Sequence, residues 1–296
     1  MEENDGGEPI DVFELLPNMV KFRGSRMVIK YGGNAMVNEE LQRNVIKDVV
    51  FLELIGVQPV IVHGGGPAIS EHMKRVGLEP EFIQGQRKTD SEALEIVEMV
   101  LCGKVNNQIV KLINKVGTKA IGLSGKDGKL ITARKHLREV MRNGAIDSLD
   151  LGQVGEVESI DESILFTLSD NGFIPVIAPI GVGEDDQDYN INADILAGEV
   201  AKAIHAERLI YLTDVDGIMK DPDDPDSIMN YIDAPEARAM INRDIKGGMI
   251  PKIESCINAL DGGVGSAHII NGMKKHSLLR SLLVDDGEGT MIKPGL

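Results

Sequence analysis

Short apolar, β-branched runs alternate with longer helix-like patterns along most of this 296-residue chain. The first pair is MVIK followed by NEELQRNVIKDVVFLELIG, and the next is QPVIVH followed by PAISEHMKRVG. Strand-like runs that alternate with helical patterns indicate βαβ units. The sequence therefore predicts an α/β fold, in which a mostly parallel central sheet lies between helices in three αβα layers.

Two stretches interrupt the alternation. The segment from KLITARKH to LGQVGEVESI lacks helical periodicity, which favours a β-hairpin added to the sheet. The polar run GVGEDDQDYN, from Gly181 to Asn190, predicts a junction between two lobes. We therefore expect an N-terminal arm at residues 1–24, a first lobe at residues 25–184 and a second lobe at residues 185–296.

Composition excludes several classes of protein. A formal net charge of −16 argues against a broad nucleic-acid surface but leaves room for a small anionic ligand. No apolar run reaches the roughly 18 residues that a membrane helix needs, and the acidic first ten residues do not resemble a signal peptide. The only cysteines, Cys102 and Cys256, are far apart, which favours a reducing cytoplasm over a disulfide framework or a zinc site.

Two glycine-rich loops follow predicted strands, where ligands bind in sheets of this kind. In KYGG, Lys30 leaves the strand, and Gly32 and Gly33 allow backbone conformations that expose N–H groups. In HGGGP, Gly64–Gly66 precede Pro67, which suits the first turn of a helix. Each loop alone could be a tight turn, but two of them, one with a lysine, favour a phosphate site.

Two later segments strengthen this interpretation. In NINAD, Asn192 or Asp194 could cap a helix, and LTDV places Thr213 and Asp214 after the next strand. In GGMIPK, Lys252 lies near a helix start, where a cation opposes the helix dipole unless an anion binds there. The motifs GxxxxGK[ST], GxGxxG, HRD and DFG are absent, which argues against P-loop NTPases, Rossmann dehydrogenases and protein kinases.

The ordered set of motifs resembles the amino acid kinase family, and within it the acetylglutamate kinases of arginine biosynthesis. The resemblance extends from about Met27 to Ile292. It rests on KYGGNAM, VIVHGGGPAIS, GQRKTD, GLSGKDG, NINAD, LTDVDGI, GGMIPKIESC and GGVGSAHII. Departures occur at QGQRKTD, which bears on substrate identity, and at NGMKKHS and VDDGEGT, which bear on regulation.

The resemblance implies that ATP, with Mg²⁺ bound through its phosphates and no dedicated metal site, phosphorylates the side-chain carboxylate of N-acetyl-L-glutamate. The first lobe would bind the acyl amino acid and the second lobe the nucleotide. The implied catalytic residues are Lys30, Lys252 and Asp194. The implied substrate-binding residues are Gly65, Gly66, Arg87 and Asn190. The implied nucleotide-binding residues are Gly32, Gly33, Thr213, Asp214, Gly248 and Met249.

The implied chemistry agrees with the residues present. A carboxylate nucleophile, with a pKa of about 4.3, is ionised at neutral pH and needs no general base. Catalysis then depends on positioning and charge, which lysines and glycine amides supply. Arg87 offers a planar fork for the second carboxylate, or alternatively a surface salt bridge to Asp90 or Glu92.

Other functions stay open at this point. Carbamate kinases, aspartokinases and kinases of carrier-bound amino acids would share the glycine loops. A catalytically silent sensor of nucleotide or arginine is an alternative from another class, although the presence of both Lys30 and Lys252 argues against it.

The segment DVFELLPNMVKF, Asp11 to Phe22, has apolar residues at helical spacing, with Pro17 expected to kink the helix or begin a new turn. It resembles the arm of arginine-inhibited acetylglutamate kinases, which links dimers into hexamers. His268 and Asp286 lie where that family contacts arginine. We expect a homo-oligomer, dimer or hexamer, with a nitrogen-signalling protein as a further possible partner. The alternative is that the segment packs only on its own domain.

Overall fold

The computed structural model describes residues 12–36, 38–83, 85–142, 145–221, 224, 227–241, 243–245, 247–284 and 288–295. These residues form a central eight-stranded sheet. In spatial order its strands are β12 (Tyr231–Asp233), β14 (Thr290–Lys293), β13 (Ser266–Asn271), β11 (Arg208–Thr213), β1 (Arg26–Tyr31), β2 (Gln58–His63), β8 (Phe173–Ala178) and β5 (Lys119–Ser124). Only the β13–β14 pair is antiparallel, so the predicted mostly parallel sheet is confirmed.

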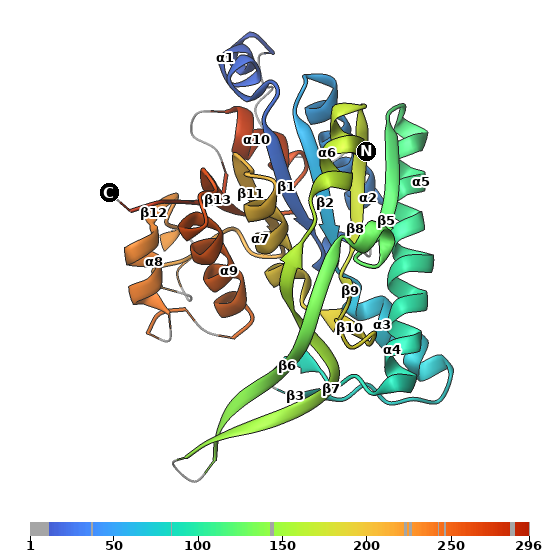
Figure 1. Ribbon diagram of the computed structural model, residues 1–296. Coiled ribbons are helices and arrows are strands. Elements are labelled where there is room, and N and C mark those ends of the chain that lie inside the picture. The colour runs from blue at the N-terminus through green and yellow to red at the C-terminus, as the bar shows by residue number, and fades with distance from the viewer. Residues whose placement is uncertain are drawn as a thin grey trace, which may run out of the picture.

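Helices cover both faces of this sheet, as Figure 1 shows. One face carries α1 (Val12–Phe22), α2 (Glu39–Leu54), α3 (Gly66–Arg75), α4 (Ser91–Glu98), η2 (Met99–Asn106), α5 (Asn107–Val116) and α10 (Ser277–Leu283). The other carries α6 (Ser163–Asp170), α7 (Ala193–Ala203), α8 (Ala234–Met240) and α9 (Met249–Asp261). The three predicted αβα layers are therefore confirmed.

The two faces of the central strands contribute to two separate hydrophobic cores. In β1, Ile29 and Tyr31 belong to the core under α2, whereas Val28 belongs to the core under α7. Because side chains alternate along a strand, Lys30 lies on the α7 side with Val28. The same alternation in β2 places His63 on the α2 side of the sheet.

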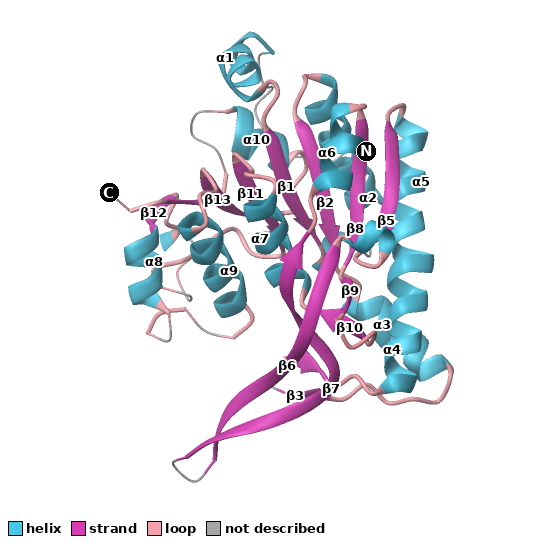
Figure 2. Cartoon of the chain, viewed as in Figure 1, coloured by secondary structure: helices cyan, strands magenta, loops and turns pink. Residues whose placement is uncertain are grey.

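Smaller β elements project beyond the carboxyl ends of the central strands (Figure 2). The predicted hairpin is confirmed as β6 (Ile131–Arg142) and β7 (Ala145–Ile160), which close a small barrel with β9 (Ile180–Val182) and β10 (Asp188–Ile191). A two-stranded sheet pairs β3 (Phe82–Ile83) with β4 (Gln86–Arg87). Short helical turns are η1 (Gly33–Met36) and η3 (Asp127–Lys129). The central sheet takes strands from both sides of residue 184, and the division into two lobes stays a prediction.

The N-terminal segment forms α1, which includes Pro17 within one helix. Leu15 and Phe22 are buried against the body of the protein, and Leu16 and Val20 are exposed. The side chain of Asn18 donates to the carbonyl of Leu283 in α10 at 3.0 Å. Across the described ranges, no helix combines the length and the apolar character that crossing a bilayer requires.

Candidate active site

Lys30 lies near the carboxyl end of β1, in the middle of the sheet, and is only 8% exposed. The ammonium group of Lys30 lies next to Gly32, since a Cβ added to Gly32 would lie 2.7 Å from Nζ of Lys30. Gly33 has φ +68°, a conformation that favours glycine. The KYGG motif therefore leaves room for an ammonium group beside a turn of bare backbone.

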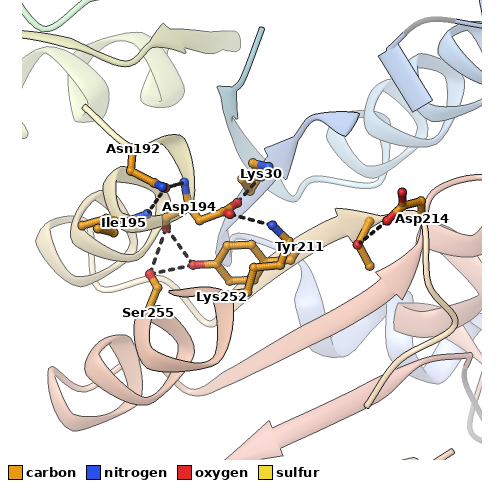
Figure 3. Close-up of polar contacts among 9 residues, drawn as sticks. Lys30, Asn192, Asp194, Ile195, Tyr211, Asp214, Lys252 and Ser255 are labelled. Carbon is orange, nitrogen blue, oxygen red and sulfur yellow. Dashed lines mark hydrogen bonds and ion pairs between the residues drawn. The ribbon is translucent and has the colours of Figure 1, made fainter. Parts of the chain in front are cut away.

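Asp194 holds this ammonium group together with a second one. Asn192 is the N-cap of α7, because its Oδ1 accepts from the backbone N–H groups of Asp194 and Ile195. The capping role thus falls to Asn192, and the carboxylate of Asp194 is left to bind cations. Its Oδ1 lies 2.8 Å from Nζ of Lys30, and its Oδ2 lies 2.6 Å from Nζ of Lys252 (Figure 3).

The three charges lie close together in a buried place. Burial raises the pKa of Asp194, but the ammonium groups of Lys30 and Lys252 lower it, and the net result is a pKa below the usual range. Asp194 is therefore ionised at neutral pH, and the cluster carries one net positive charge. Lys252 lies in the first turns of α9, as the sequence predicted, so its ammonium group adds to the positive end of that helix dipole.

Buried hydroxyl groups fix the backbone under this cluster. The main-chain carbonyl of Asp194 lies 2.9 Å from the hydroxyl groups of both Tyr211 and Ser255, which lie 2.7 Å from each other. Gly198 lets α7 approach α9, because a Cβ there would lie 2.3 Å from Oγ of Ser255. We did not identify Tyr211, Ser255 or Gly198 from the sequence, although Ser255 lies one helical turn beyond Lys252.

A cleft of about 300 Å³ extends from Lys30 and Asp194 to Arg87. The loop Gly64–Gly66 forms one wall, and Gly66 begins α3, which turns its amino end toward the cleft. Asn190 of β10 lines the same cleft, and its amide lies 3.4 Å from Oγ1 of Thr89. The cleft therefore brings together all of the predicted substrate-binding residues.

Arg87 is the most unusual charge in the cleft. It is 7% exposed, and it donates to the carbonyl of Gly66 at 3.1 Å and to Oγ of Ser70 at 2.8 Å. Its guanidinium lies 4.6 Å from the centre of the Phe82 ring. Burial lowers its pKa, but an arginine stays protonated at neutral pH.

The alternative role for Arg87, a salt bridge to Asp90 or Glu92, is wrong. Asp90 instead caps α4 through the backbone N–H of Ala93. Among the described residues, Arg87 makes its polar contacts with neutral groups only. A buried cation without a carboxylate partner favours binding of an anionic ligand.

The β6–β7 hairpin adds two residues that sequence reasoning missed. His136 and Glu156 line the cleft, and Nδ1 of His136 lies 3.3 Å from Oε2 of Glu156. Arg134 lies 2.6 Å from the other carboxylate oxygen. Burial raises the pKa of Glu156, whereas Arg134 and His136 lower it to below its usual range. No motif in the sequence marked this pair.

The predicted nucleotide-binding residues lie along the same edge of the sheet. Thr213 ends β11, the strand next to β1, and its hydroxyl lies 3.3 Å from Oδ1 of Asp214. Gly248 is the N-cap of α9 and Met249 is its first residue. Gly248 and Asp214 are exposed. Within the described ranges, no cluster of three or more His, Cys, Asp or Glu side chains is arranged to hold a metal ion.

A second cavity, of about 330 Å³, lies between α1 and the sheet. Lys21 of α1, Arg208, Glu288 and His268 line it. His268 is 3% exposed, and burial lowers its pKa to about 3. Asp286, the other residue predicted here, lies outside the described residues.

The comparisons with known proteins agree with this geometry. Residues 25–271 match the amino acid kinase family. The chain belongs to this family. The acetylglutamate kinase of Moorella thermoacetica is 51% identical over 285 residues, which cover 96% of each chain. That of Methanococcus maripaludis is 49% identical over 293 residues, 99% of each chain. The predicted resemblance to acetylglutamate kinases is confirmed.

Solved structures of the amino acid kinase fold extend the likeness. An N-acetylglutamate synthase from Neisseria gonorrhoeae, complexed with coenzyme A and N-acetyl-glutamate, superimposes with a TM-score of 0.82 at 26% identity. The match covers 96% of this chain and 63% of the synthase. A carbamate kinase from Giardia lamblia, with a TM-score of 0.64, 17% identity and coverage of 92% of this chain and 99% of the kinase, shares the fold.

Proposed function

We propose that this chain is an ATP-dependent kinase of arginine biosynthesis that converts N-acetyl-L-glutamate into N-acetylglutamyl 5-phosphate. The curated relatives at about half identity support this assignment. The observation that carries it is a single cleft lined at one end by Lys30 and Asp194, whose carboxylate also binds Lys252, and at the other end by the buried Arg87, which contacts only neutral groups among the described residues. A substrate with two carboxylates, one to react and one to be held, fits these two ends.

The reaction needs charge stabilisation and no proton transfer. A side-chain carboxylate oxygen of the substrate attacks the γ-phosphorus of ATP, and a C–O–P linkage forms. The bond from that phosphorus to the β–γ bridging oxygen breaks, and its electron pair leaves with ADP. Lys30 and Lys252 stabilise the transferring group and the leaving phosphate, and Asp194 holds both ammonium groups in place.

At the other end of the cleft, Arg87 holds the α-carboxylate of the substrate. The amide of Asn190 and the backbone N–H groups of Gly65 and Gly66 bind the acyl amino acid beside it. ATP enters as its magnesium complex, with the metal on its phosphates. The nucleotide contacts are assigned to Gly32, Gly33, Thr213, Asp214, Gly248 and Met249.

The test is ADP release with N-acetylglutamate, glutamate, aspartate and carbamate in parallel, with the acyl phosphate trapped as a hydroxamate. We expect N-acetylglutamate to be turned over best, and turnover to require magnesium. Equal or faster turnover of aspartate or carbamate would overturn the assignment. Carbamate has no second carboxylate for Arg87, and a silent sensor would release no ADP at all.

We also propose that α1 serves in self-association and in regulation. Leu16 and Val20 form an exposed apolar edge on α1, which supports association with a second copy. The cavity beside α1 is the proposed arginine site. His268 lies in its wall, and Asp286 is close in sequence to Glu288, which also lines it. A nitrogen-signalling partner stays a prediction, and the two free cysteines support the predicted cytoplasmic location.

Light scattering and arginine titration of the full chain and of a chain without residues 1–24 test this regulation. We expect the full chain to be a hexamer inhibited by arginine, and the truncated chain to be an active dimer without inhibition. A full-length dimer that arginine does not affect would contradict both proposals.

A further inference from the structure

His63 and Asn106 lie outside the proposed catalytic set, yet both are buried next to the glycine loop that follows β2. His63 is fully buried at the end of β2, and Asn106 is 4% exposed at the end of η2. Polar side chains in an apolar core need hydrogen-bond partners there. The partners of this pair lead directly to the loop.

Asn106 determines which nitrogen of His63 carries the proton. Nδ2 of Asn106 lies 2.8 Å from the carbonyl oxygen of Val176, which can only accept, so this atom is the amide donor. The same nitrogen lies 3.1 Å from Nε2 of His63 and donates to it. A neutral imidazole that accepts at Nε2 carries its proton on Nδ1. Burial favours this neutral ring and lowers the pKa of His63 to about 4.

The protonated Nδ1 of His63 donates to the carbonyl oxygen of Gly64 at 3.0 Å. The N–H of Gly64 is held as well, because it donates to the carbonyl of Tyr31 at 2.9 Å. Both ends of Gly64 are therefore fixed by groups that belong to the central sheet. The orientation of the next peptide unit follows from this constraint.

In a trans peptide the C=O and N–H groups point in opposite directions. The Gly64 carbonyl faces the imidazole on the α2 side of the sheet, so the N–H of Gly65 is turned to the other side. That side holds Lys30 and Asp194, and Gly65 lines the same cleft. The hydrogen bond from His63 thus turns a backbone donor toward the site where the proposed anionic groups meet.

The helical segment η2 supports this arrangement at two places. It is a π-helix, a wider turn that is frequent at functional sites. Asn106 packs against bare backbone, since a Cβ at Gly122 would lie 1.8 Å from its Oδ1. Leu101 packs against the loop itself, since a Cβ at Gly65 would lie 2.6 Å from its Cδ2. The η2 segment therefore contacts both the imidazole of His63 and the glycine loop that this imidazole orients.

We propose that His63, kept in its Nδ1–H form by Asn106, is a positioning residue that aims the Gly65 N–H into the cleft. It touches no substrate and exchanges no proton. The proposal rests on the proposed function only for the identity of the anion, which is a carboxylate or phosphoryl oxygen of the reactants.

Two variants of His63 separate positioning from packing. The side-chain nitrogen of His63→Asn lies near the place of Nδ1 and retains a donor for Gly64. The side-chain amide of His63→Gln lies near the place of Nε2, where its oxygen can accept from Asn106, and it leaves the Gly64 carbonyl without that donor. Because loss of one preorganised donor costs about 10²-fold or more in kcat, we expect His63→Gln to lose at least about tenfold and His63→Asn clearly less. KM for ATP should change little in either variant. The opposite order, with Gln better because it is closer to His in size, would overturn the proposal.

A spectrum of the wild-type chain with ¹⁵N-labelled histidine tests the tautomer without any substrate. We expect a proton on Nδ1 of His63 and none on Nε2 at pH 7, with His63→Asn used to assign the signal. A proton on Nε2 would overturn the proposal even if the enzyme is active. An inactive wild type would instead contradict the proposed substrate, while the spectrum still decides the tautomer.

Discussion

The two ends of the cleft hold positive charge in different ways. At one end, Lys30 and Lys252 share the carboxylate of Asp194, at 2.8 and 2.6 Å. At the other end, Arg87 is buried among neutral acceptors and lies over the ring of Phe82. The first end is a charge cluster in which one carboxylate pairs with two ammonium groups, and the second is a buried cation that contacts only neutral groups among the described residues.

This difference corresponds to the two tasks of the proposed reaction. Charge is redistributed at the phosphoryl group, so the cations there must be held in position throughout, and a shared anion prevents their repulsion. The α-carboxylate keeps the same charge in the ground state and in the transition state. A cation that binds this carboxylate equally in both states lowers KM but raises kcat little. Substitutions at the two ends should therefore differ in kind as well as in size.

The largest effect is expected at the lysine end. Lys252→Ala and Lys30→Ala should each lower kcat on the order of 10²-fold or more, because each removes a preorganised charge from the transition state. Steady-state ADP release measures this. Arg238→Ala is the matched control. It removes an exposed ion pair between Arg238 of α8 and Asp261 of α9, the helix that carries Lys252, and its kcat should stay near wild type. Near-normal kcat in Lys252→Ala would contradict the two-lysine mechanism.

Stability should separate Asp194 from its partners. Each lysine variant leaves Asp194 paired with the other ammonium group. The free energy of unfolding of each lysine variant should therefore be close to that of the wild type. Asp194→Ala leaves two ammonium groups buried near each other and should destabilise the fold by about 3 kcal/mol or more. Urea denaturation of the three variants gives the comparison, and equal losses would show that the carboxylate does not organise the cluster.

A smaller effect, and one of another kind, is expected at Arg87. Arg87→Ala should raise KM for N-acetylglutamate by about 10- to 100-fold with little change in kcat, because a charged hydrogen bond contributes about 1.5–3 kcal/mol to both states. Lys88→Ala is the control, since Lys88 is the neighbouring cation and pairs with Glu81 on the surface. A fall in kcat at unchanged KM would place Arg87 in the chemical step instead.

The sequence was sufficient for the lysine end and insufficient for its supports. Strand ends in a parallel sheet meet at one edge, so motifs after strands predicted a phosphate site beside Lys30, and the resemblance to the amino acid kinases implied that Asp194 and Lys252 belong to it. The choice between Asn192 and Asp194 as the cap needed local geometry. The pairs His63–Asn106 and Gly198–Ser255 join residues far apart in the chain, and such contacts depend on how the helices pack on the sheet.

The packing under the lysine end should have a smaller effect on activity than Arg87 has. In Gly198→Ala, the new Cβ would lie 2.3 Å from Oγ of Ser255, which should cost about 1–3 kcal/mol of stability and lower kcat several-fold as α7 and α9 move apart. Adding Ser255→Ala removes that atom and leaves the main-chain oxygen of Ser255 at 3.2 Å and its Cβ at 3.6 Å. The double variant should therefore lose less stability than the sum of the two single variants in a double-mutant cycle. Additive losses would show that the contact does not set the spacing of the helices.

The smallest effect concerns pH. A change of pH should leave the charges of Asp194 and Arg87 unchanged but should alter the stability of the fold. Asp194 has a pKa below its usual 3.8 and Arg87 stays charged, so neither of these charges should change from about pH 8 to 5.5. His63, with a folded pKa of about 4, is protonated in the unfolded chain below pH 6.5 while it stays neutral in the fold.

Acid therefore favours unfolding. This stability is present in full above pH 6.5 and decreases as pH falls toward 4, by at most about 3 kcal/mol at 1.36 kcal/mol per pKa unit. His268 acts in the same direction. Asp48 acts in the opposite direction, because burial raises its pKa to about 6 and the fold then binds the extra proton. Urea unfolding at pH 5 and 7 should show a net loss in acid that shrinks in His63→Asn, and an unchanged loss in that variant would mean that other groups cause the acid sensitivity.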